Sequence, residues 1–456
     1  MKHPFAQAQL HPTPAAQSPS RPTLASTALS ALVIAGGLIA GGLAGCSGGA
    51  SGSGADGGDN VTGEVICEPA ETRACYSGSD GTEGVGACTG GTETCSADGT
   101  AWSSCEGEVT PSAEACDNNI DDDCNGAVDD ILDIDGDGYT TCDGDCCETV
   151  QQCEQPALVN PGAIEVTAED GMESGDENCN GVVDEAAVLC DTGIALDDAD
   201  PVRGANAIDI CDASYGLVSA AYVRADGSPF ATSEQHGIHA NFGTNVVPQL
   251  GDGMLTLSTG AARATGEPNA CTTESCAGSG AGTPPVGFPQ DVPSCAGGTN
   301  INDDIAFELT LKAPANAKGY SFDFKFYSFE YPEWVCTTFN DQFVAIVEPA
   351  PEGAINGNIA FDSQTNPVSV NIAFFDVCEG CPLGTADLAG TGFDVLDDAG
   401  ATDWLRTQAP ITAGEEFTIK FLIWDTGDAA FDSTVLIDNF RWLADPVAVG
   451  TDIIVD

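Results

Sequence analysis

The sequence predicts a mainly β protein in which an Asp-rich, cysteine-rich segment with little regular secondary structure precedes an extracellular, jelly-roll-like β-sandwich. The sandwich is predicted by short runs of alternating apolar and polar residues, separated by turns rich in Gly, Pro, Asn and Asp. These runs are residues 254–258, 305–311, 320–326, 343–347, 367–374, 417–424 and 434–443. In residues 320–326 the aromatic side chains share one face of the strand, which we expect to be buried.

The chain is strongly acidic. It has 12 Lys and Arg against 71 Asp and Glu, a formal net charge of −59. Such a chain repels nucleic acid and anionic membranes, so no nucleic-acid partner is expected. The imbalance is greatest in residues 63–200, where 35 acidic residues accompany one basic residue, Arg73. A segment this acidic folds only with counter-ions, covalent cross-links or both.

The cysteines predict a disulfide framework, because 21 Cys in one chain are typical of proteins outside the cytosol. Residues 63–116 are disulfide-rich, and the Gly-, Thr- and Ser-rich run from Cys75 to Cys105 resembles a small repeat of large bacterial surface proteins. We expect it to be a spacer. Cys378-x-x-Cys381 has the spacing of half a zinc site, but no second pair and no nearby His completes it, so a disulfide is favoured.

The N-terminus predicts export and a lipid anchor. Residues 28–44 are an uncharged apolar run that leads into Leu43-Ala44-Gly45-Cys46. This tetrapeptide resembles the lipobox of bacterial lipoproteins, which implies that residues 1–45 are a signal peptide and that a lipid on Cys46 is the contact with the membrane. The alternative is a single transmembrane helix, since the run is near the lower length limit. Without Cys46 the cysteine number is even, and residues 46–62 form a Gly- and Ser-rich tether.

Residues 117–190 contain three runs in which side-chain oxygens recur at every second position before a Gly. This pattern suits a hard cation, because the chain curls round the ion and Gly permits the sharp turn. The candidate ligands are Asp117, Asp121, Asp123, Asn125, Asp129, Asp133, Asp135, Asp137, Asp143, Asp145, Asp176, Asn178, Asn180 and Asp184. The runs are not EF-hands, because Leu132, Gly144 and Ala187 stand where the bidentate Glu belongs. Oxygen ligands dominate and His is absent, so several Ca²⁺ ions are preferred to zinc or copper. The alternative is a solvated acidic linker without ions.

Two of these runs, residues 117–130 (DNNIDDDCNGAVDD) and 177–185 (ENCNGVVDE), resemble the metal-binding repeat of the MopE type. Residues 133–139 (DIDGDGY) and Asp143-Gly144-Asp145 resemble thrombospondin type 3 calcium loops. That family has Asn after the last Asp, whereas this chain has Cys146-Cys147, and the pairing of these cysteines is left open. The resemblance implies calcium bound in an extracellular segment.

Residues 195–445 carry four blocks that resemble the choice-of-anchor L family. The blocks are 257–261 (LSTGA), 327–343 (with YSFEYPE and FNDQF), 358–371 (with NIA and VSVN) and 425–433 (DTGDAAFDS). The blocks match the family in their order and spacing, and the resemblance covers residues 196–445. Residues 446–456 are predicted to be a C-terminal tail. The resemblance implies an extracellular β domain on proteins that varied anchors hold at the cell surface, and it brings no established activity.

This domain also contains candidate ligands of a further metal. Four acidic residues lie beside apolar strand residues, where an unpaired charge is costly to bury and a Ca²⁺ ion would neutralise several charges at once. They are Glu330, Asp341, Asp428 and Asp432. The alternative is that they are exposed turn carboxylates or form ion pairs with Arg406, Lys420 or Arg441.

The sequence favours a binding or structural role over catalysis. No nucleophile elbow, P-loop or dinucleotide fingerprint occurs, and His236-x-x-His239 alone is a weak metal motif. We expect a lipid-anchored protein of the outer membrane that faces the exterior. Its calcium-stabilised stalk presents the β-sandwich for adhesion or surface structure, with a glycan or protein as ligand. The alternatives are a calcium-dependent carbohydrate-binding module and, less favoured, a surface polysaccharide hydrolase with a carboxylate pair such as Glu330 and Asp341.

Overall fold

The computed structural model describes residues 65–166, 175–185, 188–211, 215–231, 234–276, 278–372, 374–395 and 398–454. The chain divides into two compact units, and Ile66–Asp456 is the second. The predicted signal peptide, the predicted lipidation site Cys46 and the whole of the predicted tether lie outside the described residues. Within the described part of the chain, no helix is long and apolar enough to cross a membrane.

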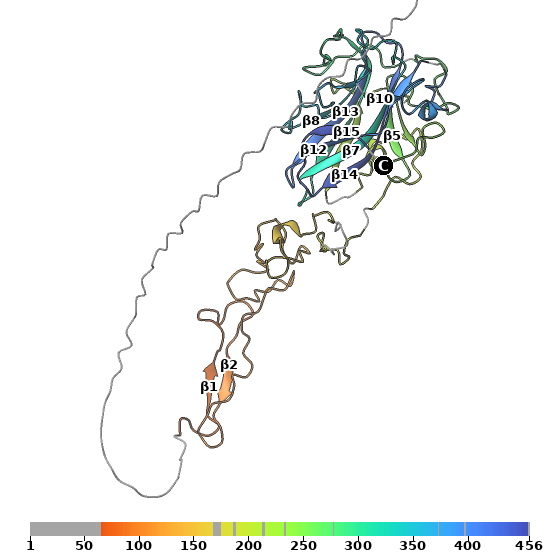
Figure 1. Ribbon diagram of the computed structural model, residues 1–456. Helices are drawn as coiled ribbons and strands as arrows, with labels where there is room; N and C mark the ends of the chain where they lie inside the picture. Colours follow the sequence, from red (N-terminus) through yellow and green to blue (C-terminus); the bar gives the residue numbers. More distant parts are fainter. Residues whose placement is uncertain are drawn as a thin grey trace, which may run out of the picture. The chain divides into compact units, whose positions relative to one another are not determined.

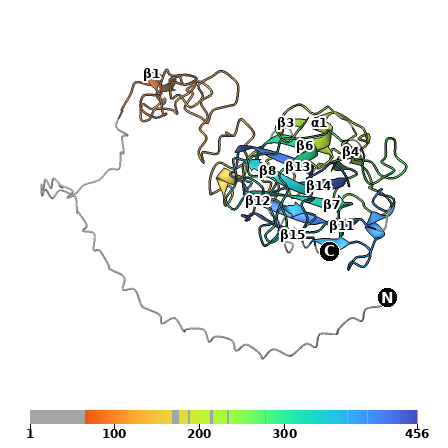
Figure 2. The same ribbon diagram turned by 90° about the horizontal axis from the view of Figure 1, so that it is seen from above.

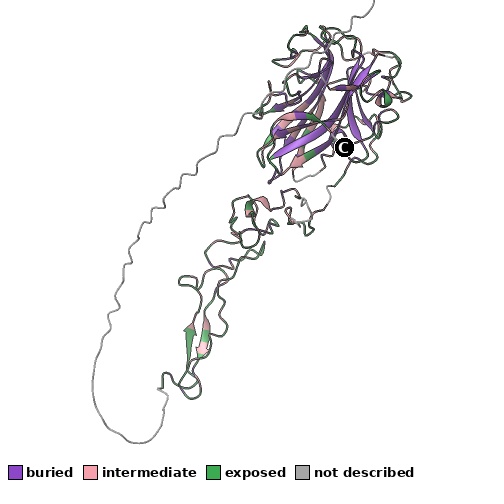
Figure 3. Cartoon of the chain, viewed as in Figure 1, coloured by how far each residue is buried: buried purple, intermediate pink, exposed green. Residues whose placement is uncertain are grey.

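The N-terminal part of this unit has little regular secondary structure, as predicted (Figure 1). It contains one antiparallel hairpin, β1 (Thr72–Cys75) with β2 (Gly91–Thr94), and the short 3₁₀ helix η1 (Pro156–Leu158). Most of its side chains are exposed or half-buried (Figure 3). Six disulfides cross-link it: Cys67–Cys95, Cys75–Cys105, Cys88–Cys124, Cys116–Cys142, Cys146–Cys179 and Cys147–Cys153. A disulfide that closes a loop of a few tens of residues stabilises the folded state by about 3–4 kcal/mol, mainly because it restricts the unfolded chain.

The β domain consists of two antiparallel sheets. The five-stranded sheet has the order β3 (Gly216–Val223), β6 (Ile301–Lys312), β13 (Glu416–Thr426), β8 (Gln342–Glu348), β9 (Val368–Ser369). The eight-stranded sheet has the order β10 (Phe375–Val377), β11 (Gly400–Thr402), β7 (Gly319–Ser328), β14 (Ser433–Leu443), β5 (Met254–Ser258), β4 (His236–His239), and β12 (Leu405–Pro410) pairs with β7 and with β15 (Gly450–Ile453). The described residues of the domain include the helix α1 (Pro201–Asn206) and the 3₁₀ helix η3 (Ala386–Leu388).

The two sheets pack face to face on one hydrophobic core (Figure 2). The predicted aromatic face of β7 is buried completely, because Tyr320, Phe322, Phe324 and Phe326 all point into this core. Phe322 packs edge-on against Phe421 of β13, with the ring centroids 4.8 Å apart. Truncating a buried Phe of this kind to Ala typically costs about 3–5 kcal/mol.

The strand predictions hold for the long, strongly alternating runs and fail for one of the others. The predicted strand 367–374 is wrong over most of its length, because only Val368 and Ser369 pair with β8 before the chain turns away. Sequence analysis also missed β3, β4 and β12, which show weaker alternation. The jelly-roll connectivity stays a prediction.

Four further disulfides lie in the β domain: Cys190–Cys211, Cys271–Cys276, Cys295–Cys336 and Cys378–Cys381. The zinc alternative for Cys378-x-x-Cys381 is therefore wrong, because the two sulfurs are bonded to each other. Every cysteine of the described residues is paired.

One buried acid of the eight-stranded sheet makes the stability of the domain depend on pH. Asp438 of β14 is fully buried, and it accepts hydrogen bonds from the backbone N–H groups of Gln249, Leu250 and Asn439. Burial, and next the charge of Asp209, raise the pKa of Asp438 to about 8 despite these bonds. At a pH between the ordinary pKa of an Asp and about 8, the folded chain therefore holds a proton at this carboxyl, whereas the unfolded chain has released it.

We predict that Asp438→Asn flattens the pH dependence of stability. The pKa of Asp438 is raised in the folded state, so the stabilisation that protonation gives is present at low pH and is lost as the pH rises towards about 8. One such proton gives a slope of up to about 1.4 kcal/mol per pH unit. Unfolding free energies at pH 5 to 8 in EDTA should fall less steeply for the variant. The exposed-site substitution Asp445→Asn has the same charge change, and equal slopes for both variants would contradict the assignment.

Candidate metal centres

In the first acidic loop, residues 117–130, the chain wraps round the carboxylate of Asp121. This buried group accepts hydrogen bonds from the backbone N–H groups of Asn125 and Gly126, at 3.1 and 3.0 Å. The turn needs left-handed backbone at Cys124 and Gly126, with φ of 62° and 98°. Gly adopts such a conformation without cost, and the disulfide to Cys88 fixes the position of Cys124.

Glu114, which precedes the loop, holds its two halves together. One of its carboxylate oxygens accepts from the N–H of Asp123 at 2.8 Å, and the other accepts from the N–H of Asp129 at 3.1 Å. Oxygens of Glu114, Asp123 and Asp130 lie within 4.8 Å of one another, close enough to share one ion. Sequence analysis predicted Asp123 and Asp129 as ligands but missed Glu114 and Asp130.

The central acidic loop, residues 133–148, gathers five carboxylates. Asp133, Asp135 and Glu148 form one group whose oxygens lie within 4.8 Å of one another, and Asp135, Asp137 and Asp145 form a second. Asp135 belongs to both groups, so the two candidate sites are adjacent. Four of the five residues were predicted from the sequence, and Glu148 was missed. Glu148 Oε2 accepts a hydrogen bond from the N–H of Ile134 at 2.9 Å, which closes the loop.

Three oxygens of this central loop are buried without a hydrogen-bond partner: Asp135 Oδ2, Asp145 Oδ2 and Glu148 Oε1. Burial raises the pKa values of Asp135 and Asp145, and the neighbouring carboxylates raise them further. Arg73, the one base of residues 63–200, pairs instead with Glu93. Buried anionic oxygens with no donor and no base are the expected surroundings of a cation.

The third acidic loop, residues 176–185, repeats the hydrogen bonds of the first. Asp176 accepts from the N–H groups of Asn180 and Gly181, at 3.0 and 2.8 Å. Glu165 accepts from the N–H groups of Asn178 and Asp184, at 3.1 and 3.0 Å, as Glu114 does in the first loop. The third loop holds fewer carboxylates, because Asn178 stands where the first loop has Asp123. Its Glu185 accepts from the side chain of Asn178 at 2.8 Å and was also missed by sequence analysis.

The bracing glutamates had a sequence signal. Pro111-Ser-Ala-Glu114 precedes the first loop and Pro161-Gly-Ala-Ile-Glu165 precedes the third, so the repeat extends upstream of the acidic runs. Several predicted ligands lie outside the carboxylate groups, and two of these, Asp117 and Asp143, are exposed. Asp143 accepts from the N–H and hydroxyl of Thr140.

The structure buries three of the four acids predicted for the β domain, just beyond the ends of β7, β8 and β14. Glu330, Asp341 and Asp432 are each at most 4% exposed, whereas Asp428 lies in an exposed turn. Asp425, which sequence analysis missed, completes the group as a fully buried carboxylate at the end of β13. The proposed pairing with bases is wrong for these acids. Arg406 pairs with Asp323, Lys420 pairs with Glu308, and Arg441 donates to Asn439.

Within this group the acids raise one another's pKa values. Burial, and next the charge of Asp341, raise the pKa of Glu330 to about 10. Burial raises the pKa of Asp341 to about 7 and that of Asp432 to about 7, although both accept hydrogen bonds. Burial and the charges of Asp341 and Asp432 raise the pKa of Asp425, which the side chain of Thr259 lowers in part. Protons or a cation must therefore compensate these carboxylates.

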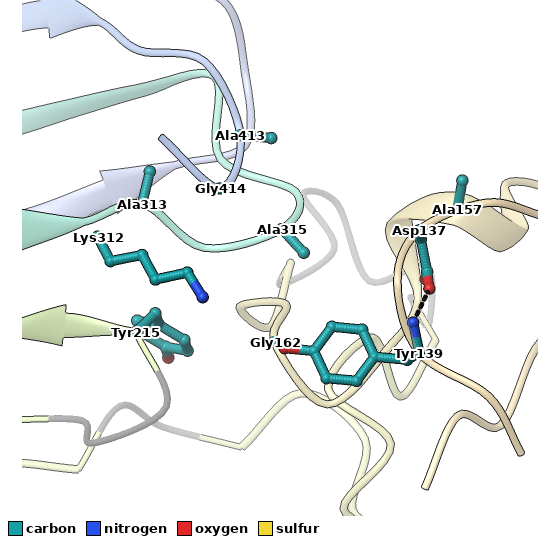
Figure 4. Close-up of a pocket in the computed structure, with 10 residues that line it drawn as sticks. All are labelled: Asp137, Tyr139, Ala157, Gly162, Tyr215, Lys312, Ala313, Ala315, Ala413 and Gly414. Atoms are coloured by element: carbon teal, nitrogen blue, oxygen red, sulfur yellow. Dashed lines mark hydrogen bonds between the residues drawn. The ribbon is translucent and has the colours of Figure 1, made fainter. Parts of the chain in front are cut away.

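A small cavity lies between the central acidic loop and the loops of the β domain (Figure 4). Its volume is 270 Å³, and Tyr139, Tyr215 and Lys312 contribute its larger side chains. This volume is below the usual range of ligand pockets. Asp137, its acidic residue, already accepts from the N–H of Tyr139 at 2.9 Å and from the side chain of Asn160 at 2.7 Å. The arrangement resembles a packing gap more than a substrate site.

The comparison with protein families decides what the β domain is. A choice-of-anchor L domain is found at residues 217–440. This confirms the resemblance seen in the sequence, and all four sequence blocks lie within the matched range. The choice-of-anchor L domain indicates a cell-surface protein. No curated protein matches the chain.

We predict that Glu114→Gln loosens the first acidic loop. The amide keeps one acceptor oxygen, so one of the N–H groups of Asp123 and Asp129 loses a charge-assisted hydrogen bond, worth about 1.5–3 kcal/mol. Hydrogen exchange at these two amides, followed by NMR or mass spectrometry, should accelerate by about 10- to 100-fold at one or both. Glu154→Gln changes an exposed Glu of the same segment and is the control. Equal exchange in both variants would show that Glu114 does not brace the loop.

Proposed function

We propose that this chain is a lipid-anchored cell-surface protein whose acidic segment, residues 117–190, binds several Ca²⁺ ions. The calcium-loaded segment is a stalk that presents the choice-of-anchor L domain for adhesion or surface structure. A surface location follows from the choice-of-anchor L domain. The lipid on Cys46 rests on the sequence Leu43-Ala44-Gly45-Cys46.

The observation that carries the proposal is the central acidic loop. Asp135 Oδ2, Asp145 Oδ2 and Glu148 Oε1 are buried, acidic and without a donor. Their neighbours are acids, and no Lys or Arg of residues 63–200 other than Arg73 exists to compensate them. In an exposed linker these side chains would separate into water, because like charges at close range repel one another. Their convergence is favourable when a cation lies among them.

The donor atoms favour calcium over other metals. Ca²⁺ takes six to eight oxygen ligands in flexible geometry, which loops of Asp, Glu and Asn can supply. Zinc and copper prefer nitrogen and sulfur. Residues 117–190 contain no His, and their cysteines in the described residues are bonded in disulfides.

Calcium would complete what the disulfides begin. The disulfides restrict the unfolded chain, but they do not neutralise its charge. Each ion would join carboxylates from both ends of a loop, such as Asp133 and Glu148, and so would stiffen a segment that has almost no hydrophobic core. A stiff segment holds the outer domain at a defined distance from its anchor, which suits a protein that contacts a glycan or a protein outside the cell.

We predict that the full chain binds several Ca²⁺ ions and that Asp135→Asn removes binding in the central loop. Asp135 belongs to both carboxylate groups there, so its loss weakens two adjacent sites. At 100 times the dissociation constant, one site stabilises by about 2.7 kcal/mol, so calcium should raise the unfolding temperature of the wild-type chain more than that of the variant. Isothermal titration calorimetry gives the ion number, and thermal melts with calcium or EDTA give the shift.

The control for this experiment is Asp143→Asn, which removes an exposed carboxylate of the same loop that lies outside both groups. Asp143→Asn should bind as many ions as the wild-type chain. Absence of calcium binding by the wild-type chain, or equal losses in the two variants, would overturn the calcium-bound stalk and leave the segment as a solvated acidic linker.

A further inference from the structure

We propose that Asp341, Asp425 and Asp432, with Glu330 beside them, bind one hard divalent cation, with calcium favoured, inside the choice-of-anchor L domain. This site is separate from the acidic segment, and it does not depend on calcium binding there. It lies where the strands of both sheets end, and its role is structural.

Strand register brings these acids to one place. In the five-stranded sheet Trp424 of β13 pairs with Gln342 of β8. Asp425 follows Trp424 and Asp341 precedes Gln342, so the two acids lie at the same end of this antiparallel pair. In the other sheet Ser433 of β14 pairs with Ser328 of β7, and Asp432 and Glu330 lie just beyond these residues. The four acids therefore come from two strand ends in each sheet.

Hydrogen bonds link the two sheets at this point. Asp341 Oδ1 accepts from the N–H of Thr426 at 2.9 Å, within its own sheet. Its Oδ2 accepts from the hydroxyl of Ser433 at 2.6 Å, across to β14. Glu330 accepts from the N–H of Asp341 at 3.3 Å. The carboxylates are thus held in position by the strands that carry them.

Several oxygens at this point have no partner. Asp425 is 1% exposed, and neither its Oδ1 nor its Oδ2 makes a hydrogen bond of ordinary geometry, although the side chains of Thr259 and Asp341 lie close to its carboxyl. Asp432 Oδ1 is also unpartnered, while its Oδ2 accepts from the N–H of Cys276 at 2.8 Å. A buried carboxylate without any donor is rare, because ionised groups lose several kcal/mol of hydration on burial. The unpartnered oxygens of Asp425 and Asp432 are thus available as ligands of a cation.

No base takes that place among the described residues. None of the ion pairs there involves Glu330, Asp341, Asp425 or Asp432. Other buried acids of the domain do have a base, such as Asp323 with Arg406. Arginine thus compensates Asp323 and Asp304, whereas no ion pair compensates the four acids at the strand ends.

The surroundings fit a hard cation. The ligand atoms are carboxylate oxygens, and the nearby sulfurs of Cys271 and Cys276 are joined in a disulfide, so no thiolate is present. Calcium accepts many carboxylate oxygens in irregular geometry, whereas Mg²⁺ prefers to keep several waters. Gly260 leaves the space that Asp432 occupies, because a Cβ at this position would overlap the carboxylate. The sequence blocks that contain Gly260, Glu330, Asp341 and Asp425 thus meet at one site.

We test the site with Asp425→Asn in the full chain. The variant should bind one Ca²⁺ ion fewer per chain than the wild type, measured by equilibrium dialysis and elemental analysis. The difference in melting temperature between the variant and the wild type should change sign when calcium is added. In EDTA the amide removes a buried carboxyl that must otherwise bind a proton, so the variant should melt at or above the wild-type temperature. In calcium it should melt below the wild type, because it lacks the ion.

Asp323→Asn is the matched control, since Asp323 is equally buried but pairs with Arg406. It should lower the melting temperature by a similar amount in EDTA and in calcium, with an unchanged ion number. Asp432→Asn is the second variant in case Asp425→Asn does not fold, because its amide oxygen can still accept from Cys276. It too should lose one ion.

Two results would overturn the proposal. One is an unchanged ion number in Asp425→Asn and Asp432→Asn. The other is a loss of stability that is the same in EDTA and in calcium, which would show that protons rather than an ion compensate the carboxylates. Asp135→Asn separates this site from the acidic segment, because the ion lost in Asp425→Asn should remain bound in Asp135→Asn.

Discussion

A carboxylate that leaves water must gain hydrogen-bond donors, a base or a cation, and this chain has 71 acidic residues against 12 basic ones. The structure uses all the available means. Asp323 is compensated by Arg406, and Asp304 by Arg224. Asp121 and Asp176 are compensated by backbone N–H groups at tight turns. In the central acidic loop and at the strand ends of the β domain, some buried carboxylate oxygens have neither a donor nor a base as partner. The shortage of bases thus explains where buried carboxylate oxygens are left without a partner.

The two parts of the described chain solve the folding problem differently. The β domain buries a continuous core between two sheets, in which Phe322 and Phe421 meet across the layers. The N-terminal segment has no comparable core, and its order comes from disulfides and from the hydrogen bonds of Glu114 and Glu165 to backbone groups. Cross-links and bracing glutamates fix the path of the chain, but they leave the acidic side chains close together. If it binds ions as proposed, such a segment would gain more order from them than the β domain would.

How much the sequence predicts depends on the range of the interaction. Alternation is local, so the long strands β6, β7, β13 and β14 were predicted correctly, as was the buried aromatic face of β7. Residues 367–374 alternate as well, yet only two of them find a partner strand, and partner strands are not visible in a local pattern. Disulfide pairing is equally non-local. Asp425 was missed for a similar reason: it reads as a turn residue, and only the pairing of β13 with β8 places it beside Asp341. Glu114 and Glu165 could have been found, because the repeat includes the Pro and Ala that precede them.

The same ligand chemistry has different consequences in the two settings. In the acidic loops an ion would join residues that are close in sequence, such as Asp133 and Glu148, so it would organise one loop and its neighbour. At the strand ends an ion would join Asp425 and Asp341 of one sheet to Asp432 and Glu330 at the other, residues up to about a hundred positions apart. A link between distant residues opposes unfolding more strongly than a local one, because it closes a longer loop in the unfolded chain. With ions bound as proposed, the acidic loops would therefore set the stiffness of the segment that carries the domain, whereas the strand-end site would set the cohesion of the two sheets themselves.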